Sequence, residues 1–506
     1  MTALFDAIAS GAIVTGHRPW LRAVVDAETW TALAAQLAAG RWTLLSLWGE
    51  ADAVQMALLD EEAGTVAVAT LPCPDGAYPS VGRLHAPAQR LERAARDLFG
   101  LVATDAPDVR PWLDHGRWGL SHPLAAGGPG VAQSAPYAFL SAEGEGLHQV
   151  AVGPVHAGII EPGHFRFTAN GEAVVRLEER LGYVHRGLDG LMAGAALERG
   201  AALAGRVSGD STVAYGLAFA RAVEAALQVE VPPRAIWQRG VMAELERLAN
   251  HVGDIGAICN DAAFPRLLAP CAVLREQVLR AAQLAFGHRL MMDGVIPGGV
   301  ATALSPEGAS AIRAVRDIVG KALPGLMALY DGTASLQDRT VGTGRAHPDL
   351  VRRFGCAGVV GRASGRGFDV RRTLPYAPYD QLAFDVPALH EGDVNARVWI
   401  RFREVEQSLS LIGQMLDRVP TDGPLTVDLG AQESGPCEGL ALVEGFRGDV
   451  LAFVRLDRAL RIARCHLRDP SWFHWPVLEA AIEGNIIADF PLINKSFNCS
   501  YAGQDL

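Results

Sequence analysis

Thiol groups are the side chains of this 506-residue chain that could bind a transition metal, and their spacing limits what they can do. A nickel or iron–sulfur centre is held by several soft, anionic thiolates, often as Cys-x-x-Cys pairs. The chain has seven cysteines, and the two closest in sequence are Cys259 and Cys271. This spacing is too wide for a local metal clip. The sequence therefore contains no cysteine cluster, and any iron–sulfur centre would have to be held by a partner protein.

Motifs spread over the chain carry a family resemblance. Residues 153–167 read Gly-Pro-Val-His-Ala-Gly-Ile-Ile-Glu-Pro-Gly-His-Phe-Arg-Phe, and Gly-Tyr-Val-His-Arg-Gly follows at 182–187. Further matching segments lie at 230–235, 244–251, 297–300, 379–387, 469–471 and 488–499. Together they resemble the large subunit of membrane-bound NiFe hydrogenases of the formate-hydrogenlyase (hydrogenase-4) type. They resemble more loosely the quinone-site subunit of respiratory complex I.

The first part of the chain carries a second resemblance. Residues 78–80, 91–100 and 108–115 are similar to the small peripheral-arm subunit of complex I. In formate-hydrogenlyase-type hydrogenases that module is fused in front of the large subunit, so the order of the two modules here is specific. The resemblance implies a docking surface, and we assign no catalysis to this part.

The resemblance expects metal-binding thiols at two places where this chain has other residues. The first place reads Arg206-Val207-Ser208-Gly209-Asp210-Ser211, and at the second Cys499 follows Ser496-Phe497-Asn498, with Ala502 in the position of the partner thiol. The hydroxyls of Ser208 and Ser211 stay protonated near neutral pH and are poor nickel ligands. We therefore expect a vacated metal site at the Ser208, Gly209 and Ser211 loop, and no bound metal.

In complex I the corresponding site is the end of a quinone tunnel, lined by a His, a Tyr and an Asp. Here the Tyr position falls on Gly209, the Asp position on Asp261, and the His position on either His156 or His164. A His–carboxylate pair suits the protonation of a reduced quinone, because imidazole titrates near neutral pH. These residues are our candidates for quinone binding and proton handling. The alternative, that they are structural polar groups at helix and strand ends, stays open.

His185 and Arg186 have a different expected role. The resemblance implies that this segment approaches the terminal iron–sulfur cluster of the neighbouring small subunit. A guanidinium group there would stabilise the reduced, more negative cluster. The alternative is a surface arginine in an ordinary ion pair.

The elements that must position these residues predict an α+β fold. A small α+β docking domain is expected over 1–120, with strands at 42–48, 54–59 and 65–71 and helices at 28–39 and 86–99. A Gly/Pro-rich linker is expected over 121–145. A large, mainly helical domain is expected over 146–506. Its predicted helices span 235–258, 272–292, 306–329 and 394–416, with small antiparallel sheets near 148–176 and 439–456.

Composition excludes several classes of partner. A net charge of -11 argues against nucleic acid. No uncharged apolar run approaches the ~20 residues of a membrane span, and the N-terminus lacks the pattern of a signal peptide. Scattered cysteines suit a reducing cytoplasm. We expect a protein at the cytoplasmic face of the cell membrane, bound there by other subunits.

Three functions are compatible with these observations. The first is a hydrogenase-like large subunit without nickel, in an ion-translocating redox complex related to NADH:quinone oxidoreductase, a class linked to NAD binding and quinone binding. It would take electrons from an iron–sulfur small subunit, pass them to a quinone-like or other acceptor, and sit on antiporter-like membrane subunits. The second is a NiFe hydrogenase with atypical ligands, which the missing thiols disfavour. The third is a non-catalytic coupling or scaffold subunit.

Overall fold

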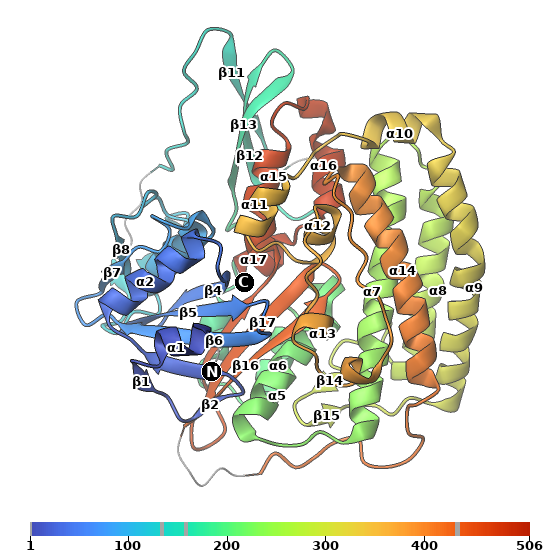
Figure 1. Ribbon diagram of the computed structural model, residues 1–506, viewed down its shortest axis with the longest axis horizontal. Coiled ribbons are helices and arrows are strands. Elements are labelled where there is room, and N and C mark those ends of the chain that lie inside the picture. Colours follow the sequence, from blue (N-terminus) through green and yellow to red (C-terminus); the bar gives the residue numbers. More distant parts are fainter. Residues whose placement is uncertain (1–2, 132–135, 156–159, 431–435) are drawn as a thin grey trace.

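The fold is α+β, as the sequence predicts, and residues far apart in the chain share its sheets (Figure 1). The structure, a computed structural model, describes residues 3–131, 136–155, 160–430 and 436–506. Within these ranges, no helix combines the length and the apolar character that a membrane crossing requires.

The first part of the chain forms a five-stranded sheet in the order β1-β3-β6-β5-β4. Strands β4, β5 and β6 are nearly continuous apolar runs, which is why both faces of this sheet are buried. The predicted strands and helices of this region are confirmed. The elements are α1 (Ala3–Ile8), β1 (Ala12–Ile13), β2 (His17–Arg18), β3 (Leu21–Val24), α2 (Ala27–Ala38), β4 (Thr43–Gly49), β5 (Ala53–Asp60), β6 (Thr65–Pro72), β7 (Ala77–Pro79), α3 (Gln89–Phe99) and β8 (Val102–Thr104).

A second sheet lies at the centre of the molecule and combines one strand from the start of the chain with three strands from near its end. Its order is β18-β17-β16-β2, formed by β16 (Cys437–Gly445), β17 (Gly448–Leu456), β18 (Ile462–Arg468) and the short β2. Glu438 of β16 pairs in parallel with His17 of β2. The first 120 residues therefore pack directly against the rest of the chain, with which they share one hydrophobic core. The separation into two domains stays a prediction.

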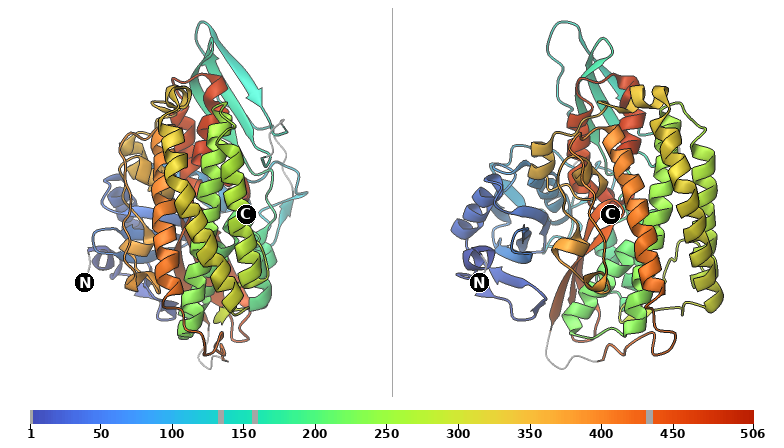
Figure 2. Two further views of the ribbon diagram at one scale, coloured as in Figure 1. Left: turned by 90° about the vertical axis from the view of Figure 1, so that its right-hand side faces the viewer. Right: turned by 45° about the vertical axis from the view of Figure 1, so that its right-hand side comes forward.

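Long helices form a bundle on the other side of this sheet (Figures 1 and 2). They are α7 (Pro233–Asp261), α8 (Leu268–Phe286), α9 (Pro306–Asp331) and α14 (Val394–Leu416). Their starts follow from the sequence: Pro233 and Pro306 stand in first turns, and the carboxylate of Asp393 caps α14 by accepting from Ala396 N at 2.7 Å. The predicted helices are thus confirmed in kind. The predicted end at residue 292 is wrong, because Gly287 adopts a left-handed conformation (φ 81°) and ends α8.

The remaining elements surround the bundle and the central sheet. The antiparallel sheet β11-β12-β13 extends beyond the end of the bundle (Figure 2). Helix α6 packs across β16 and β17. These elements are β9 (Leu120–Ser121), β10 (Gly130–Val131), β11 (Leu147–Val152), β12 (His164–Asn170), β13 (Ala173–Arg180), α4 (Leu188–Met192), α5 (Leu197–Ala204), α6 (Thr212–Leu227), β14 (Val295–Ile296), β15 (Gly299–Val300), α10 (Ala334–Thr340), α11 (Pro348–Arg353), α12 (Gly358–Ala363), α13 (Val370–Thr373), α15 (Ser471–Ala481), α16 (Phe490–Phe497) and α17 (Tyr501–Asp505). Short 3-10 turns, η1 to η4, lie at Ala86–Ala88, Gly209–Ser211, Tyr379–Gln381 and Ile487–Asp489.

Candidate functional site

Two loops from distant parts of the chain meet at the candidate site. One is the 206–211 loop before α6, and the other connects α16 to α17 over residues 498–500. Ser500 caps α17 by accepting from Gly503 N at 2.9 Å, and its hydroxyl donates to Ser208 Oγ at 3.1 Å. The two segments at which the resemblance expects thiols are therefore in direct contact.

An ion pair joins the first loop to the central sheet. Arg447, in the β16–β17 turn, donates to both carboxylate oxygens of Asp210, at 2.9 and 2.6 Å. Ser208 donates to the same carboxylate at 2.7 Å, and Arg447 also donates to Ser211 Oγ at 3.1 Å. Burial alone would raise the pKa of Asp210, but the Arg447 guanidinium lowers it to about 2. Asp210 is therefore ionised at neutral pH and cannot act as a proton donor there.

A second carboxylate joins the other loop to the bundle. Asn498 has a left-handed backbone (φ 53°), which asparagine tolerates well, and it ends α16. Its side-chain amide donates to both oxygens of Asp254 on α7, at 2.9 and 3.0 Å. Arg401 on α14 donates to Asp254 Oδ2 at 3.1 Å. The carboxylate of Asp254 is thus fully engaged by neighbouring donors.

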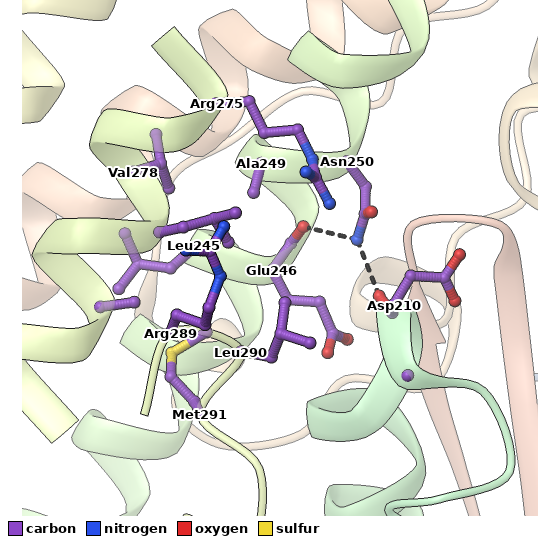
Figure 3. Close-up of a pocket in the computed structure, with 13 residues that line it drawn as sticks. Asp210, Leu245, Glu246, Ala249, Asn250, Arg275, Val278, Arg289, Leu290 and Met291 are labelled. Atoms are coloured by element: carbon purple, nitrogen blue, oxygen red, sulfur yellow. Dashed lines mark hydrogen bonds between the residues drawn. The ribbon is translucent and has the colours of Figure 1, made fainter. Parts of the chain in front are cut away.

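A cleft of about 340 Å³ opens between α7, α8 and the end of α16, beside these ion pairs. Behind it is a cavity of about 10 Å³, which is room for a single water molecule (Figure 3). Asn250 lines both spaces, and its amide donates to the backbone oxygens of Asp210 and Glu246 at 2.7 and 2.9 Å. The cleft is lined by Asp210, Asn250, Gly253, Asp254, Ala257, Leu268, Ala272, Arg275, Glu276, Lys495 and Asn498.

Glu246 lines the small cavity, and its pKa is shifted far from the ordinary value of a glutamate. Its two carboxyl oxygens accept from Val213 N and Ala214 N, at 2.7 and 3.0 Å, in the first turn of α6. Burial raises the pKa of Glu246 to about 8, in spite of these two hydrogen bonds. Glu246 is therefore mostly protonated at neutral pH, unlike Asp210.

The negative side chains of the cleft form ion pairs within the described part of the chain, whereas two of its positive side chains do not. Asp210, Asp254 and Glu276 all have arginine partners. Two half-buried cations, Arg275 and Lys495, make no ion pair or hydrogen bond among the residues that the structure describes. The charge available to a ligand in the cleft is therefore positive.

The donors at the junction of the two loops do not fit nickel. Ser208, Ser211 and Ser500 offer neutral hydroxyls, and the Asp210 carboxylate is held by Arg447. Burial raises the pKa of the Cys499 thiol well above its usual range, so that it stays protonated. In the described ranges of the chain, no three His, Cys, Asp or Glu side chains are grouped as metal ligands. Nickel chemistry has no set of thiolates to support it here.

The predicted site residues lie as follows. Asp261 is the exposed last residue of α7, about 16 Å along the helix axis from Asn250. His164 starts β12, where Nδ1 lies 3.1 Å from the Gly153 oxygen, and burial lowers its pKa. His156 lies outside the described residues. Within the part that is described, neither Asp261 nor His164 forms a hydrogen bond with the Ser208–Ser211 loop.

Three further predicted residues, Gly209, His185 and Arg186, lie in or beside the 206–211 loop. A Cβ added at Gly209 would meet no atom within 4 Å, so the position expected to carry a tyrosine faces open space. Arg186 donates to the backbone oxygens of Arg206 and Val207, each at 2.7 Å, and so supports the 206–211 loop. His185 Nδ1 lies 2.7 Å from the Asp505 oxygen. These contacts hold the segment to the 206–211 loop and to α17.

Sequence reasoning missed the charged residues that define the site, which are Asp210, Glu246, Asp254, Arg275, Arg447 and Lys495. A signal for part of this set was present. Glu246, Asn250 and Asp254 recur every four residues of α7, so that they lie along one face of this helix. Asp210 stands inside the loop that was singled out. The contribution of Arg447 could not be seen, since its partner is more than two hundred residues away.

Comparison with known proteins identifies both parts of the chain. Residues 23–131 match the family described as "Respiratory-chain NADH dehydrogenase, 30 Kd subunit". Residues 268–434 and 429–505 match "Respiratory-chain NADH dehydrogenase, 49 Kd subunit". The chain is 30% identical to formate hydrogenlyase subunit 5 of Escherichia coli over 441 residues, covering 85% of this chain and 77% of that protein.

Two further likenesses agree. The carbon monoxide-induced hydrogenase of Rhodospirillum rubrum is 30% identical, over 69% of this chain and 97% of its own length. A chain of the membrane-bound sulfane sulfur reductase, an archaeal respiratory membrane complex, superimposes with a TM-score of 0.67 at 28% identity, covering 72% of this chain and 99% of that chain. The chain therefore belongs to the complex I-related family that includes the large subunits of formate-hydrogenlyase and hydrogenase-4 type, with a 30 kDa-type module fused in front of a 49 kDa-type module.

Proposed function

We propose that this chain is a redox subunit without nickel, which takes electrons from a partner iron–sulfur subunit and delivers them to a quinone-like acceptor in the cleft between α7, α8 and α16. The family makes it a complex I-related redox subunit. The acceptor, the donor and the coupling to ion movement are the proposal.

The observation that carries this proposal is the pair of cations in the cleft. Arg275 and Lys495 form no hydrogen bond or close ion pair among the described residues, whereas the neighbouring carboxylates are already neutralised by arginines. A quinone becomes negatively charged when it accepts electrons, and its carbonyl oxygens accept hydrogen bonds from such cations. The cleft is thus better suited to a reduced acceptor than to its neutral form.

A proton source adjoins the same cleft. Glu246 is protonated at neutral pH and lines the cavity that can hold one water molecule, next to Asn250. A proton could pass from its carboxyl group through that water toward the cleft. Glu246 takes the role in this proposal that the sequence suggested for Asp261 and a histidine.

Partners and location follow from the relatives as proposals. Formate hydrogenlyase and the archaeal sulfane sulfur reductase are named as assemblies, the latter as a respiratory membrane complex. We expect this chain to bind an iron–sulfur small subunit near His185 and Arg186, and to sit with antiporter-like membrane subunits at the cytoplasmic face of the membrane.

The test uses the assembled complex and a water-soluble quinone. Arg275→Met and Lys495→Met should each raise the KM for the quinone about tenfold or more, because each removes a charge-assisted hydrogen bond. Arg280→Met is the matched control, since Arg280 is on the same helix, is largely exposed and points to Glu276. An unchanged KM in both cleft variants would contradict the proposed acceptor site. About one nickel per chain by elemental analysis would contradict the absence of a metal centre.

A scaffold role is the second candidate, and one observation favours it. The Asp210–Arg447 pair and its serine partners already fill the junction of the two loops with internal hydrogen bonds. If the complex translocates ions while no quinone binds to the wild-type protein, the scaffold role replaces the redox role.

A further inference from the structure

Seven charged side chains gather in the interior between the helix bundle and the central sheet. Each has at most 2% of its surface exposed, although arginine and carboxylate side chains are rarely so deeply buried. They come from α7, α12, α14, β16 and the start of α13. We call them the buried ion cluster, and they are Glu244, Arg247, Arg362, Asp369, Arg371, Glu404 and Glu444.

The members are paired in a continuous network. Arg362 lies 2.9 Å from Glu404, 2.9 Å from Glu444 and 3.3 Å from Asp369. Arg371 lies 2.9 Å from Glu244 and 2.7 Å from Asp369. Arg247 completes it, at 3.5 Å from Glu244 and 3.6 Å from Glu404.

The charges of the cluster do not balance. It contains three arginines, which stay protonated, and four carboxyl groups. His251, which is next to Glu404, does not supply the missing charge: burial and then the neighbouring arginines hold its pKa well below the usual range. An isolated net negative charge in this interior would be costly. One of the four carboxyl groups is therefore expected to carry a proton.

Several polar atoms beside the cluster have no hydrogen-bond partner. Neither carboxylate oxygen of Glu404 accepts a hydrogen bond, and neither ring nitrogen of His251 makes one, although both side chains are completely buried. Arg362 Nη2 is also without an acceptor. Buried polar atoms in such a position are usually satisfied by internal water.

We propose that the buried ion cluster is a proton-binding site, in which Glu444 carries one exchangeable proton and internal water molecules satisfy the polar atoms of Glu404 and His251. This inference goes beyond the proposed function, because it concerns the resting protein and requires no acceptor. Glu444 lies near the end of β16, three residues before Arg447 in the β16–β17 turn, so the proton-binding site adjoins the candidate functional site.

Among the described residues, Glu444 is the carboxyl group of the cluster with the fewest ion pairs: it pairs with one arginine, Arg362, whereas the other three carboxylates each pair with two or three arginines. Its oxygens accept from Arg362 at 2.9 Å and from Val370 N at 3.0 Å. Burial and the negative charge of Asp369 raise the pKa of Glu444 to about 7, against the attraction of three arginines.

Other groups facing Glu444 leave this balance unchanged. Arg247 donates to the backbone oxygen of Glu444 at 2.8 Å. The backbone N–H of Glu444 donates to the hydroxyl oxygen of Tyr376 at 3.3 Å. On the α6 side of β16, Arg221 donates to the Leu442 oxygen and stacks on the ring of Tyr376. Arg221 lies in no ion pair with the cluster.

Infrared spectroscopy tests the proposal, because only protonated carboxyl groups give the carboxylic C=O stretching band. The full chain is titrated from pH 5 to pH 9, and loss of this band is followed. Glu444→Gln should remove the part of the titration near pH 7 that belongs to the cluster. Asp369→Asn should remove it too, since three arginines then face three carboxylates, which can all be ionised.

Glu92→Gln is the matched control. Glu92 is a buried glutamate of α3 with a pKa also raised to about 7 by burial, but its oxygens accept from Ser80 Oγ and Val81 N and no arginine pairs with it. The decrease of the carboxylic C=O band in Glu92→Gln gives the size of the signal from one carboxyl group. Asp369→Asn should leave the Glu92 signal unchanged.

Each outcome decides the proposal. Loss of one carboxyl group from the titration in both Glu444→Gln and Asp369→Asn supports it. An unchanged titration in Glu444→Gln overturns it, and so does retention of the Glu444 signal in Asp369→Asn, because the charge count would then be irrelevant. If a variant does not fold, the wild-type protein labelled with ¹³C at glutamate carboxyl groups is used, and the absence of any buried glutamate titrating near pH 7 beyond those lost in Glu92→Gln and Glu246→Gln overturns it.

Discussion

At the scale of single residues, charged groups join the two loops in place of the thiolates that the resemblance expects. Asp210 and Arg447 supply opposite charges that neutralise each other, whereas thiolates would need a metal cation to do so. Ser208, Ser211 and Ser500 complete the hydrogen bonds. The junction can therefore be stable without a metal.

Asp210→Asn should destabilise the protein. The variant leaves the buried guanidinium of Arg447 without its carboxylate, which would cost about 3–5 kcal/mol in a fully buried pair. Since about a third of the Asp210 side chain is exposed, we expect about 1–3 kcal/mol, measured as the free energy of unfolding in urea. The matched control is Asp293→Asn, which breaks an exposed pair with Arg206 and should cost less than about 1 kcal/mol.

The pH dependence of this effect has a defined sign. The pKa of Asp210 is lowered from 3.8 to about 2, so its contribution is present above pH 3.8 and is lost as the pH falls through about 2. The stability difference between wild type and Asp210→Asn should therefore shrink in acid. Equal costs for Asp210→Asn and Asp293→Asn at neutral pH would contradict a structural role for the ion pair.

The sequence predicts the position of the Ser208–Ser211 loop, but it does not identify the carboxylate that contacts the loops. The Ser208–Ser211 loop could be found because its neighbours follow a family motif. Counting from Asn250 and His251 predicts Asp261, but α7 continues to Asp261 and places it at the exposed end of the helix. Asp254, four residues after Asn250, is the carboxylate that reaches the loops.

At the scale of elements, the packing of α7 against α8 determines the width of the cleft. Two glycines of α7 allow the close approach. A Cβ at Gly253 would lie 2.7 Å from Arg275 Cδ, the middle of a flexible side chain. A Cβ at Gly256 would lie 2.7 Å from Cys271 Cβ and 3.2 Å from the backbone of Leu268.

Alanine at these two glycines should therefore have different effects. Gly253→Ala should displace the Arg275 side chain and weaken quinone binding, while unfolding free energy changes by less than about 1 kcal/mol, because alanine favours the helix. In Gly256→Ala, on the same helix, the added methyl group would meet the backbone of α8, which cannot move aside. This variant should lower the free energy of unfolding by about 1–3 kcal/mol. Urea denaturation and quinone titration measure the two effects. Full quinone affinity in Gly253→Ala would show that Arg275 does not contact the acceptor.

Long elements could be predicted from sequence, whereas short ones could not. The helix predicted at 394–416 is α14, because its apolar spacing extends over many turns and Asp393 marks its start. The two-residue strand β2 has no periodicity of its own. It is extended because β16 provides hydrogen-bonding partners, and those are absent from the local sequence.

At the scale of the whole molecule, the first 120 residues are held to the remainder by more than a linker. Glu438 of the central sheet pairs with Arg22 of β3 at 2.7 Å and with Arg455 of β17 at 2.5 Å. Arg455 also pairs with Glu50, and His466 lies 2.9 Å from Ser46. Apart from Glu438–Arg455, these pairs link residues more than four hundred positions apart, which no pattern within a local segment could reveal.

Cutting the linker should therefore leave the two parts bound to each other. A protease site inserted at Gly127–Gly128, which are exposed and have no atom within 4 Å of an added Cβ, allows a single cleavage. After cleavage both fragments should elute together in size-exclusion chromatography at pH 7, because the β2–β16 pairing and the buried ion pairs do not depend on chain continuity. Fragments that separate at once would mean that the linker alone joins them.

Acid and a single substitution should weaken this association through Glu438. Burial opposes ionisation of Glu438, but the hydrogen bond with His17 and the charges of Arg22 and Arg455 lower its pKa to about 2. The stabilisation that Glu438 provides is thus present above pH 4.5, the ordinary pKa of a glutamate, and is lost as the pH falls through about 2.

Glu438→Gln in the cleaved protein should release the first fragment at a lower urea concentration at pH 7, because Arg22 would remain buried without a carboxylate. Glu276→Gln, which removes an exposed carboxylate far from this interface, should release it at the wild-type concentration. Equal release in the two variants would show that the apolar core, and not the Glu438 ion pairs, holds the two parts together.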